Sequence, residues 1–359
     1  MPAIGAPVRV ALLGYGLAGR IFHAPLLGAV PGFELRTVVT SDPERATQAA
    51  RDLPGVQVQA RAGSIWAHPG DHDLVVVATT TATHVSLAAA AVDAGLSVVV
   101  EKPLAPSAAE ARQLVAHAAS RGVMLVPFHN RRWDADHLTL RRLVADGELG
   151  TVARYESRFE RWRPVADPAA WRHSTPAAEG GGVLLDLGPH LVDQAVQLFG
   201  DVAAVYGEVT ARRGGADDDA FLALEHRSGV RSHLWASAVA AAPGPRLRVL
   251  GSRAAFVVPG LDGQESALRA GRRPGEPGFG DEPADRWGRL HGVAADPAAG
   301  RPVPSEPGRW TDFYRLVRAA LAGDGPPPVD AADAVAVAAI LDAARRSSVS
   351  GTVEVPAVG

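Results

Sequence analysis

The chain has 359 residues, a length that suggests two domains, and 47% of its residues are apolar while 21% are charged. This composition is typical of a globular protein and excludes a wholly disordered chain. The net charge of −3 gives no general attraction to nucleic acid or anionic membranes, and the lack of cysteine excludes disulfides, thiolate nucleophiles, iron–sulfur clusters and cysteine-based zinc sites.

The first predicted element is a strand over residues 8–13. A glycine-rich turn follows, Gly14-Tyr15-Gly16-Leu17-Ala18-Gly19, and then a predicted helix from Arg20 to Ala29. Between a strand and a helix, this spacing is typical of dinucleotide binding: the glycines permit a tight turn, close approach of a pyrophosphate and close helix packing. The first N–H groups of the helix favour the phosphates. We predict that these six residues contact a dinucleotide; a plain structural turn is the alternative.

Strands and helices alternate through residues 1–127, which predicts a doubly wound parallel sheet in a dinucleotide-binding domain. The further strands are expected over 33–40, 74–79, 97–100 and 123–126, and the helices over 43–52, 84–94 and 108–120. Ligands of such sheets lie beyond the carboxyl ends of the strands. Three polar segments fall there, and from them we predict that Thr79, Thr80, His84, Glu101, Lys102 and Asn130 contact the cofactor.

The end of the second strand is where such domains distinguish NAD from NADP. Thr40, Ser41 and Arg45 could bind the additional phosphate of NADP, whereas Asp42 could bind a ribose of NAD. Before Pro43, Asp42 is also a typical helix N-cap. The predicted cofactor is therefore NADP(H) or NAD(H), with NADP(H) favoured.

Lys102 is the only lysine among 36 basic residues, the others all being arginine. An arginine stays protonated, whereas the pKa of a lysine can be tuned for proton exchange. A chain that otherwise avoids lysine retains one where the chemistry requires an amine; chance survival of one surface lysine is the alternative.

Residues 128–359 follow a different pattern, which predicts a substrate-binding and dimerisation domain of the α+β class. Strands are expected over 151–161, 202–212, 220–226, 230–238, 246–250 and 254–258, with a hairpin turn at Ser228-Gly229. They would form a large, mostly antiparallel, open-faced sheet. Residues 259–308 are rich in proline and glycine and predict a long loop or lobe. Helices over 311–321 and 331–347 could pack back on the first domain.

Within this second domain, a helix over 184–199 would place Asp186 and His190 four residues apart on one face. A carboxylate one turn from an imidazole can fix its tautomer and raise its basicity. A capping aspartate and a packed histidine are the structural alternative. Together with His129 the pair could form a metal site, but unrelated spacing is weak evidence for one, and we predict no metal.

The order of these motifs resembles the glucose–fructose oxidoreductase/inositol dehydrogenase/MocA (Gfo/Idh/MocA) family. The motifs are the turn over 14–19, Glu101-Lys102-Pro103 and Asp186-Leu187-Gly188-Pro189-His190. Further segments resemble the branch that contains NADP-dependent scyllo-inositol dehydrogenases; they are His129-Asn130-Arg131-Arg132-Trp133-Asp134, Arg163-Pro164, Trp171-Arg172, 261–265 and 267–271. The resemblance covers nearly the whole chain. It implies a Rossmann domain, an open-faced sheet that carries the substrate site and often dimerises, and catalytic roles for Lys102, Asp186 and His190.

Two positions depart from the family pattern. The family often has Thr-Pro-Asn-x-x-His after the strand that ends near Ala78, whereas this chain has Thr79-Thr80-Thr81-Ala82-Thr83-His84. The inositol branch can carry an arginine where this chain has Asp42. The first departure bears on contacts to the nicotinamide side of the cofactor, and the second on the preference for NADP.

The resemblance predicts hydride transfer between nicotinamide and a secondary alcohol of a cyclitol or sugar. In this hypothesis His190 is the base, oriented by Asp186, and Lys102 binds the hydroxyl and stabilises the alkoxide. The predicted substrate contacts are Lys102, Asn130, Arg131, Trp133, Tyr155, Arg163, Trp171, Arg172 and His190. The alternatives are a non-catalytic dinucleotide-binding regulator, imine reduction, and glycoside hydrolysis through transient oxidation.

The expected partners are a small polyol or sugar and further copies of the same chain, bound through the open sheet. Apolar stretches fall short of the about 18–20 residues that a membrane helix needs. Since the run Val8–Leu13 is interrupted by Gly14 and Gly16 and lacks a strongly basic segment before it, we interpret it as a strand rather than a signal peptide. We expect a cytoplasmic protein that binds neither membrane nor nucleic acid.

Overall fold

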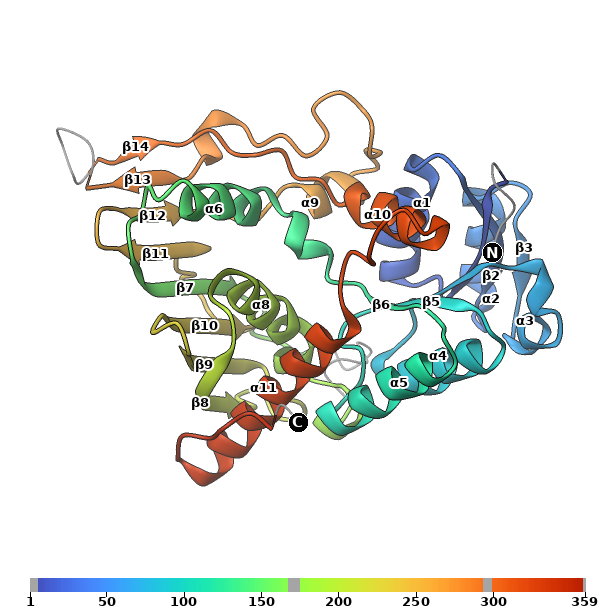
Figure 1. Ribbon diagram of the computed structural model, residues 1–359, viewed down its shortest axis with the longest axis horizontal. Helices are drawn as coiled ribbons and strands as arrows, with labels where there is room; N and C mark the ends of the chain where they lie inside the picture. Colours follow the sequence, from blue (N-terminus) through green and yellow to red (C-terminus); the bar gives the residue numbers. More distant parts are fainter. Residues whose placement is uncertain (1–5, 167–174, 293–298, 358–359) are drawn as a thin grey trace.

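A computed structural model describes residues 6–166, 175–292 and 299–357. Within them the chain forms two sheets, one at each end of the elongated view in Figure 1, with most of the helices between or beside them. The predicted fold class is confirmed: a parallel Rossmann sheet is followed by a larger and mostly antiparallel sheet.

The first sheet has six parallel strands in the order β3-β2-β1-β4-β5-β6. The strands are β1 (Val8–Leu13), β2 (Phe33–Val39), β3 (Gln57–Gln59), β4 (Leu74–Val77), β5 (Ser97–Val100) and β6 (Leu125–Pro127). The helices around them are α1 (Ala24–Ala29), α2 (Pro43–Asp52), α3 (Gly63–Ala67), α4 (His84–Asp93) and α5 (Ala108–Ser120). The strand order reverses between β1 and β4, which opens a crevice at their carboxyl ends.

The first helix departs from the sequence prediction of one continuous helix over 20–29. A π-helix spans Ala18–His23, and α1 begins at Ala24 with Pro25 in its first turn. Pro25 has no N–H to donate to the carbonyl of Ile21, so a regular α-helical ladder cannot run through this point. Single π-turns are frequent at functional sites, and this one begins within the glycine turn, at Ala18.

The second sheet has eight strands in the order β14-β13-β12-β11-β7-β10-β9-β8, and all neighbouring pairs except β7 and β10 are antiparallel. The strands are β7 (Val152–Glu160), β8 (Val202–Thr210), β9 (Asp219–His226), β10 (Arg231–Ser237), β11 (Leu247–Gly251), β12 (Ala255–Val258), β13 (Arg289–His291) and β14 (Arg301–Pro302). Buried and partly exposed residues alternate along β9, as in a strand covered on one face.

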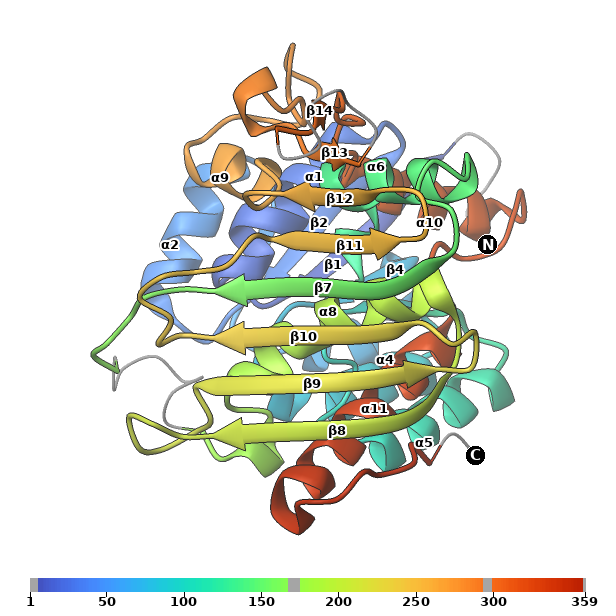
Figure 2. The same ribbon diagram turned by 90° about the vertical axis from the view of Figure 1, so that its left-hand side faces the viewer.

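Among the described residues, helices cover only the inner face of this sheet. The long helix α8 (Val183–Phe199) packs against β7, β9 and β10, and α11 (Ala331–Ser350) packs against β8. Figure 2 shows the opposite face, in front of which no described helix lies. The core between α8 and the sheet includes Leu184, Leu191 and Leu234. The inner face therefore holds the start of α8 against the first domain.

The C-terminal segments connect the two domains. Helix α10 (Thr311–Ala322) places Phe313, Tyr314 and Val317 in the apolar cluster that also contains strands of the first sheet, and α11 packs along α5. The lobe predicted over 259–308 contains α9 (Gln264–Arg269) and the last two strands at one side of the second sheet, β13 and the edge strand β14. Helix α6 (Ala135–Ala145) lies where the sequence analysis expects no helix.

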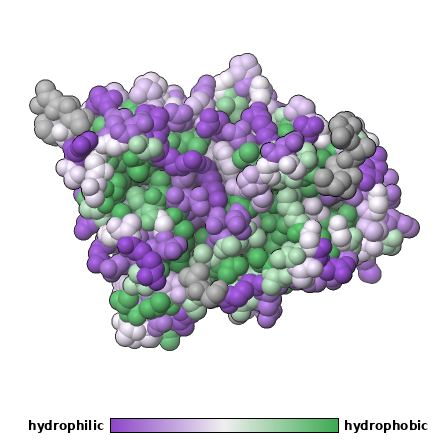
Figure 3. Space-filling model, viewed as in Figure 1, coloured by the Kyte–Doolittle hydropathy of each residue, from purple (hydrophilic) through white to green (hydrophobic). Residues whose placement is uncertain are grey.

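None of the described helices is long and apolar enough to cross a membrane. On the face seen in Figure 3, hydrophilic and hydrophobic residues are interspersed over both domains.

Candidate active site

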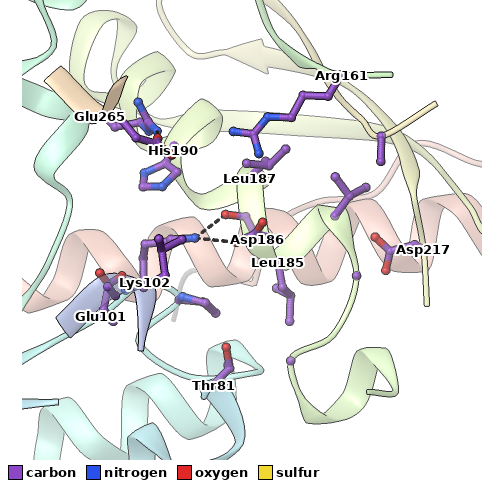
Figure 4. A pocket seen from close by; sticks show the side chains of 18 of the residues that line it. Thr81, Glu101, Lys102, Arg161, Leu185, Asp186, Leu187, His190, Asp217 and Glu265 are labelled. Carbon is purple, nitrogen blue, oxygen red and sulfur yellow. Dashed lines mark hydrogen bonds and ion pairs between the residues drawn. The ribbon is translucent and has the colours of Figure 1, made fainter. Parts of the chain in front are cut away.

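A cavity of about 200 Å³ lies between the two domains, at the carboxyl ends of the parallel strands. It is lined by the glycine turn, by the ends of β4 and β5, by the end of β7, by the first turns of α8, and by α9. Its polar lining residues are Thr79, Thr81, His84, Glu101, Lys102, Arg131, Arg161, Arg163, Asp186, His190, Arg213, Asp217, Ser237, Glu265 and Arg269. Figure 4 shows several of these side chains converging from both domains.

The glycine turn has the three properties that a dinucleotide requires. Gly14 has a φ of +97°, and a side chain there would clash with the backbone of Ala78. A side chain at Gly19 would clash with the carbonyl of Gly14, so the helix can follow closely only because this residue is glycine. A Cβ at Gly16 would meet only the guanidinium of Arg45, at 3.6 Å. The open space over Gly16 therefore fits a pyrophosphate approaching the backbone.

The other residues of the turn differ in where their side chains point. Leu17 and Ala18 line the cavity. Tyr15 is buried and its hydroxyl lies 3.3 Å from a carboxylate oxygen of Asp52. Burial and the charge of Asp52 raise the pKa of Tyr15 to about 12. Only the backbone of Tyr15 is thus available to a cofactor.

At the end of β2, Asp42 has the structural role that its position before Pro43 indicates. Its Oδ1 accepts hydrogen bonds from the backbone N–H groups of Glu44 (2.9 Å) and Arg45 (3.1 Å), so it caps α2. Thr40 is buried, and its hydroxyl accepts a bond from the N–H of Asp42, whereas Ser41 is exposed. The guanidinium of Arg45 lies beside Gly16 and 3.3 Å from Asp42.

His84 joins two segments of the first domain at the cavity. Its Nδ1 lies 2.8 Å from the carbonyl oxygen of Pro103 and its Nε2 lies 3.3 Å from that of Thr79. Burial lowers the pKa of His84. Thr79 and Thr81 line the cavity, whereas Thr80 is exposed and lies outside the lining.

Glu101 is held by a buried chain of hydrogen bonds that the sequence analysis does not foresee. Its Oε1 lies 3.2 Å from Nε2 of His23, and Nδ1 of His23 lies 2.6 Å from the hydroxyl of Tyr314 on α10. Its Oε2 accepts the backbone N–H of Lys102 at 3.0 Å. Burial alone would raise the pKa of Glu101, but the hydrogen bond and charge of His23 and the charge of Lys102 hold this pKa below its usual value. Glu101 therefore fixes the backbone at Lys102.

Lys102 spans the gap between the domains (Figure 4). Its ammonium donates to the carbonyl oxygen of Asp186 at 2.6 Å and to Oδ1 of Asp186 at 2.9 Å. The Lys102 side chain is only 13% exposed. The lone lysine and the predicted acid thus meet at the first turn of α8, although 84 residues separate them in the sequence.

His190 lies one turn further along α8 and lines the same cavity. The expectation that Asp186 orients His190 is not what the structure shows: among the described residues, Asp186 is hydrogen-bonded to Lys102, and Nδ1 of His190 is buried without a hydrogen-bond partner. Burial, with the positive charges of Lys102 and Arg131, holds the pKa of His190 well below 6.5. The imidazole is therefore neutral at pH 7 and able to accept a proton.

The predicted substrate contacts divide into two groups. Arg131 and Arg163 line the cavity. Asn130, Trp133 and Tyr155 are buried and lie outside its lining. Trp133 packs edge-on against Phe313, at 5.9 Å between ring centroids, and Tyr155 packs near Phe199, at 5.4 Å. These two aromatic side chains belong to the apolar clusters of the core rather than to the cavity. Trp171 and Arg172 lie outside the described residues.

Seven polar lining residues are not among the predicted site residues: Thr81, Arg161, Arg213, Asp217, Ser237, Glu265 and Arg269. They come from strand ends, connecting segments and α9, which only the tertiary fold brings to the cavity. Among the described residues, no group of three His, Asp or Glu side chains is placed to hold a metal ion.

Two family models match the chain. The model of the oxidoreductase family with an NAD-binding Rossmann fold matches residues 8–129, and the model of the GFO/IDH/MocA C-terminal domain matches residues 137–257. The oxidoreductase YdgJ of Escherichia coli is 39% identical over 95% of this chain and 96% of its own length. The NADP-dependent scyllo-inositol 2-dehydrogenase IolW of Bacillus subtilis is 34% identical over 95% of this chain and 94% of its own. Among solved structures, the oxidoreductase yvaA of Bacillus subtilis superposes with a TM-score of 0.89 and 32% identity, over 97% of this chain and 98% of its own.

Proposed function

The chain belongs to the GFO/IDH/MocA family of oxidoreductases and has its NAD-binding Rossmann domain, and from that premise we propose that it is an NAD(P)-dependent dehydrogenase of cyclitols or sugars. The reaction would transfer a hydride between nicotinamide and a carbinol carbon of the substrate. The observation that carries the proposal is the convergence of the Lys102 amine, the Asp186 carboxylate and the His190 imidazole on one cavity beside the glycine turn.

Lys102 is suited to bind the reacting hydroxyl. An ammonium group has three N–H donors, and two of those of Lys102 are directed at Asp186. The remaining donor can reach a substrate oxygen and stabilise the negative charge that develops on it. Asp186 holds the amine in place across the interdomain gap. A lysine fits this task better than an arginine because its charge is compact and its proton can be exchanged.

His190 is suited to accept the hydroxyl proton. Its neutral imidazole lies one helical turn from Asp186 in the cavity, and its low pKa keeps it unprotonated at neutral pH. A positioned general base contributes roughly 10²–10⁴-fold to a rate. In this proposal Lys102 stabilises the oxygen while His190 takes its proton.

The dinucleotide would lie against the glycine turn, where only glycine leaves the backbone free to approach phosphates. When bound, it supplies the hydride acceptor or donor. Arg45 lies beside Gly16 and is the cation best placed for the additional phosphate of NADP, while Asp42 is occupied as a helix cap. We therefore favour NADP(H), in agreement with the cofactor named for the relative IolW.

A rate screen tests the proposal. Purified protein is mixed with NADP⁺ or NAD⁺ and a panel of inositols, aldoses and sugar acids, and the absorbance of reduced nicotinamide is followed. We expect turnover with members of the panel, faster with NADP⁺ than with NAD⁺, and a loss of that preference in Arg45→Gln. Measurable dinucleotide binding without turnover on any substrate would contradict the dehydrogenase assignment.

The open face of the second sheet is the proposed surface for a homo-oligomer. Its centre carries Phe221 and Trp235, whose rings lie 5.1 Å apart, and Arg158 stacks over Trp235 at 3.9 Å. Within the described residues no helix covers this face (Figure 2). Aromatic and arginine side chains of this kind are enriched at protein interfaces. Sedimentation of the wild type and of Trp235→Glu tests this; a monomeric wild type would overturn it.

A further inference from the structure

We propose that the substrate of this cavity carries an anionic group, a carboxylate or a phosphate, which binds the guanidinium of Arg161. The inference rests on the proposed dehydrogenase function and narrows its substrate class from polyols in general to negatively charged ones. It follows from how the charges around the cavity are paired.

Most cations that line the cavity already have an acidic partner. Lys102 pairs with Asp186 at 2.9 Å. Arg131 and Arg269 share Glu265, at 2.8 and 2.9 Å. Arg213 pairs with Asp218 at 2.8 Å. Each of these charges is neutralised within the protein, and none of these cations requires a ligand.

Arg161 differs from all of them. Among the described residues its side chain makes no hydrogen bond and no ion pair, although it lines the cavity and is half-buried. Its backbone is fixed, because its N–H donates to the carbonyl of Ser237 at 2.9 Å and its carbonyl accepts from Ala240 at 3.0 Å. Figure 4 shows the guanidinium reaching from the end of β7 into the space beside Leu187. The residue is thus held in place with its donors directed at the cavity.

Three acids that line the cavity, Glu265, Asp186 and Asp217, make contacts with other residues. Glu265 and Asp186 favour its charged form from a distance, yet burial outweighs them and lowers the pKa of Arg161. Asp217 accepts the N–H of Leu184 at 2.7 Å and so caps α8. A second cation, Arg163, lines the cavity two residues further along and also has no acidic partner among the described residues. Arg161 and Arg163 are thus two cations of the second-domain wall without an ion pair among the described residues.

A planar guanidinium with all its donors available matches the two oxygens of a carboxylate or phosphate better than it matches single hydroxyls. A partly buried charge without a counterion is unfavourable, and an anionic ligand removes that penalty. The phosphates of a dinucleotide would lie at the glycine turn, on the opposite wall. Arg161 is thus left for the substrate, with Lys102 and His190 facing the carbinol across the cavity.

The test compares substrates that share one carbon skeleton: D-glucose, D-glucuronate and D-glucose 6-phosphate, with the corresponding galactose set. In the wild type we expect kcat/KM for one anionic member to exceed that of the neutral sugar by about ten- to a hundredfold, the range of a charge-assisted hydrogen bond. Arg161→Met should abolish this preference, mainly through KM. Arg161→Lys should retain part of it. Comparison of D-glucuronate with D-glucose 6-phosphate distinguishes a preference for a carboxylate from a preference for a phosphate.

Arg121→Met is the matched control, since it removes an arginine from the far end of α5, outside the cavity lining. It should leave the preference unchanged. A neutral sugar or inositol that is used as well as the charged substrates by the wild type, or a preference that persists in Arg161→Met, would overturn the inference while leaving the dehydrogenase function intact.

If no compound is turned over, the proposed function fails, and binding then decides the inference separately. The fluorescence of NADPH bound to the protein is titrated with D-gluconate and with the neutral D-glucitol. Selective binding of gluconate that is lost in Arg161→Met supports an anion site, and equal or absent binding of both contradicts it.

Discussion

The two walls of the cavity differ in how their polar groups are satisfied. On the first-domain wall, Glu101, Lys102 and His84 all make hydrogen bonds within the protein. On the second-domain wall, Nδ1 of His190 and the guanidinium of Arg161 have no such partner among the described residues. Both walls are largely buried, so burial alone does not explain the difference.

Buried polar groups in folded proteins are nearly always hydrogen-bonded, and exceptions require an explanation. The first wall is complete before any ligand arrives, as is expected of a preorganised site built on strand ends. The second wall has donors and acceptors still available, as the proposed binding of a substrate there requires. The difference is consistent with the proposed roles, in which the first wall positions the amine and the second takes part in proton transfer and substrate recognition.

The largest expected effect comes from the residue that joins the two walls. Lys102→Met removes the ammonium that would stabilise the alkoxide, and we expect kcat to fall by at least about 10³-fold, since a single stabilising donor contributes roughly 10²–10³ and the bridge to Asp186 is lost as well. The affinity for dinucleotide, measured by fluorescence titration, should change little. Lys102→Arg restores the charge but not the exchangeable proton and should recover little activity; substantial recovery would show that the charge alone suffices.

On the second wall, His190→Asn should lower kcat/KM by roughly 10²–10⁴-fold, the usual contribution of a general base. The pH dependence gives the sharper result. The active form is the neutral imidazole, and its pKa lies well below 6.5, so activity should stay high as pH falls through 6.5 and decline only in more acidic solution. This decline of activity at acidic pH should be absent from His190→Asn. A decline that already occurs at or above pH 6.5, or that is the same in wild type and variant, would contradict the assignment of His190.

The buried chain of hydrogen bonds that holds Glu101 on the first wall can be disrupted at Tyr314. In Tyr314→Phe the Nδ1 atom of His23 loses the hydroxyl 2.6 Å away and becomes an unpaired buried group. We expect the free energy of unfolding in urea to fall by about 1–3 kcal/mol. Tyr206→Phe, which removes an exposed hydroxyl, is the control and should change stability by less than about 0.5 kcal/mol. A Tyr314→Phe protein as stable as the control would show that the chain through His23 and Glu101 is unimportant.

The fold was largely predictable because its signals are local. Strong periodicity and turn residues gave α2 at the predicted bounds, Pro43–Asp52, and the apolar run of β4 within one or two residues. Elements with weak signals were missed: β3 is three residues long and partly polar, and α6 buries Asp136 and His137 against the expectation that a buried face is apolar. Tertiary contacts, such as the ion pair of Asp136 with Arg246 at 3.0 Å, make that burial possible.

The site was predictable in part. A lone lysine and an Asp–His pair at helical spacing pointed to Lys102, Asp186 and His190, and the structure brings all three to one cavity. Which of them pair could not be inferred, because the contact of Lys102 with Asp186 depends on how the domains meet. Tyr155 and Arg161 have the same parity along the strand and differ in position: Tyr155 lies within β7 in the core, whereas Arg161 follows the end of β7 and lines the cavity, and only the tertiary fold shows where the cavity begins.

The smallest expected effect concerns Asp42, whose two possible roles the sequence leaves open. In the structure its carboxylate caps α2. Like the polar groups of the first wall, it makes its hydrogen bonds within the first domain. Asp42→Ala should therefore lower the free energy of unfolding by about 1 kcal/mol through loss of the cap. The ratio of NADP⁺ to NAD⁺ affinities, measured by the same titrations, should stay near that of the wild type. If Asp42 instead bound a ribose, the variant would lose affinity for NAD⁺ with little change in the free energy of unfolding. Asp42 would then belong with the groups whose hydrogen-bond partners come from a ligand.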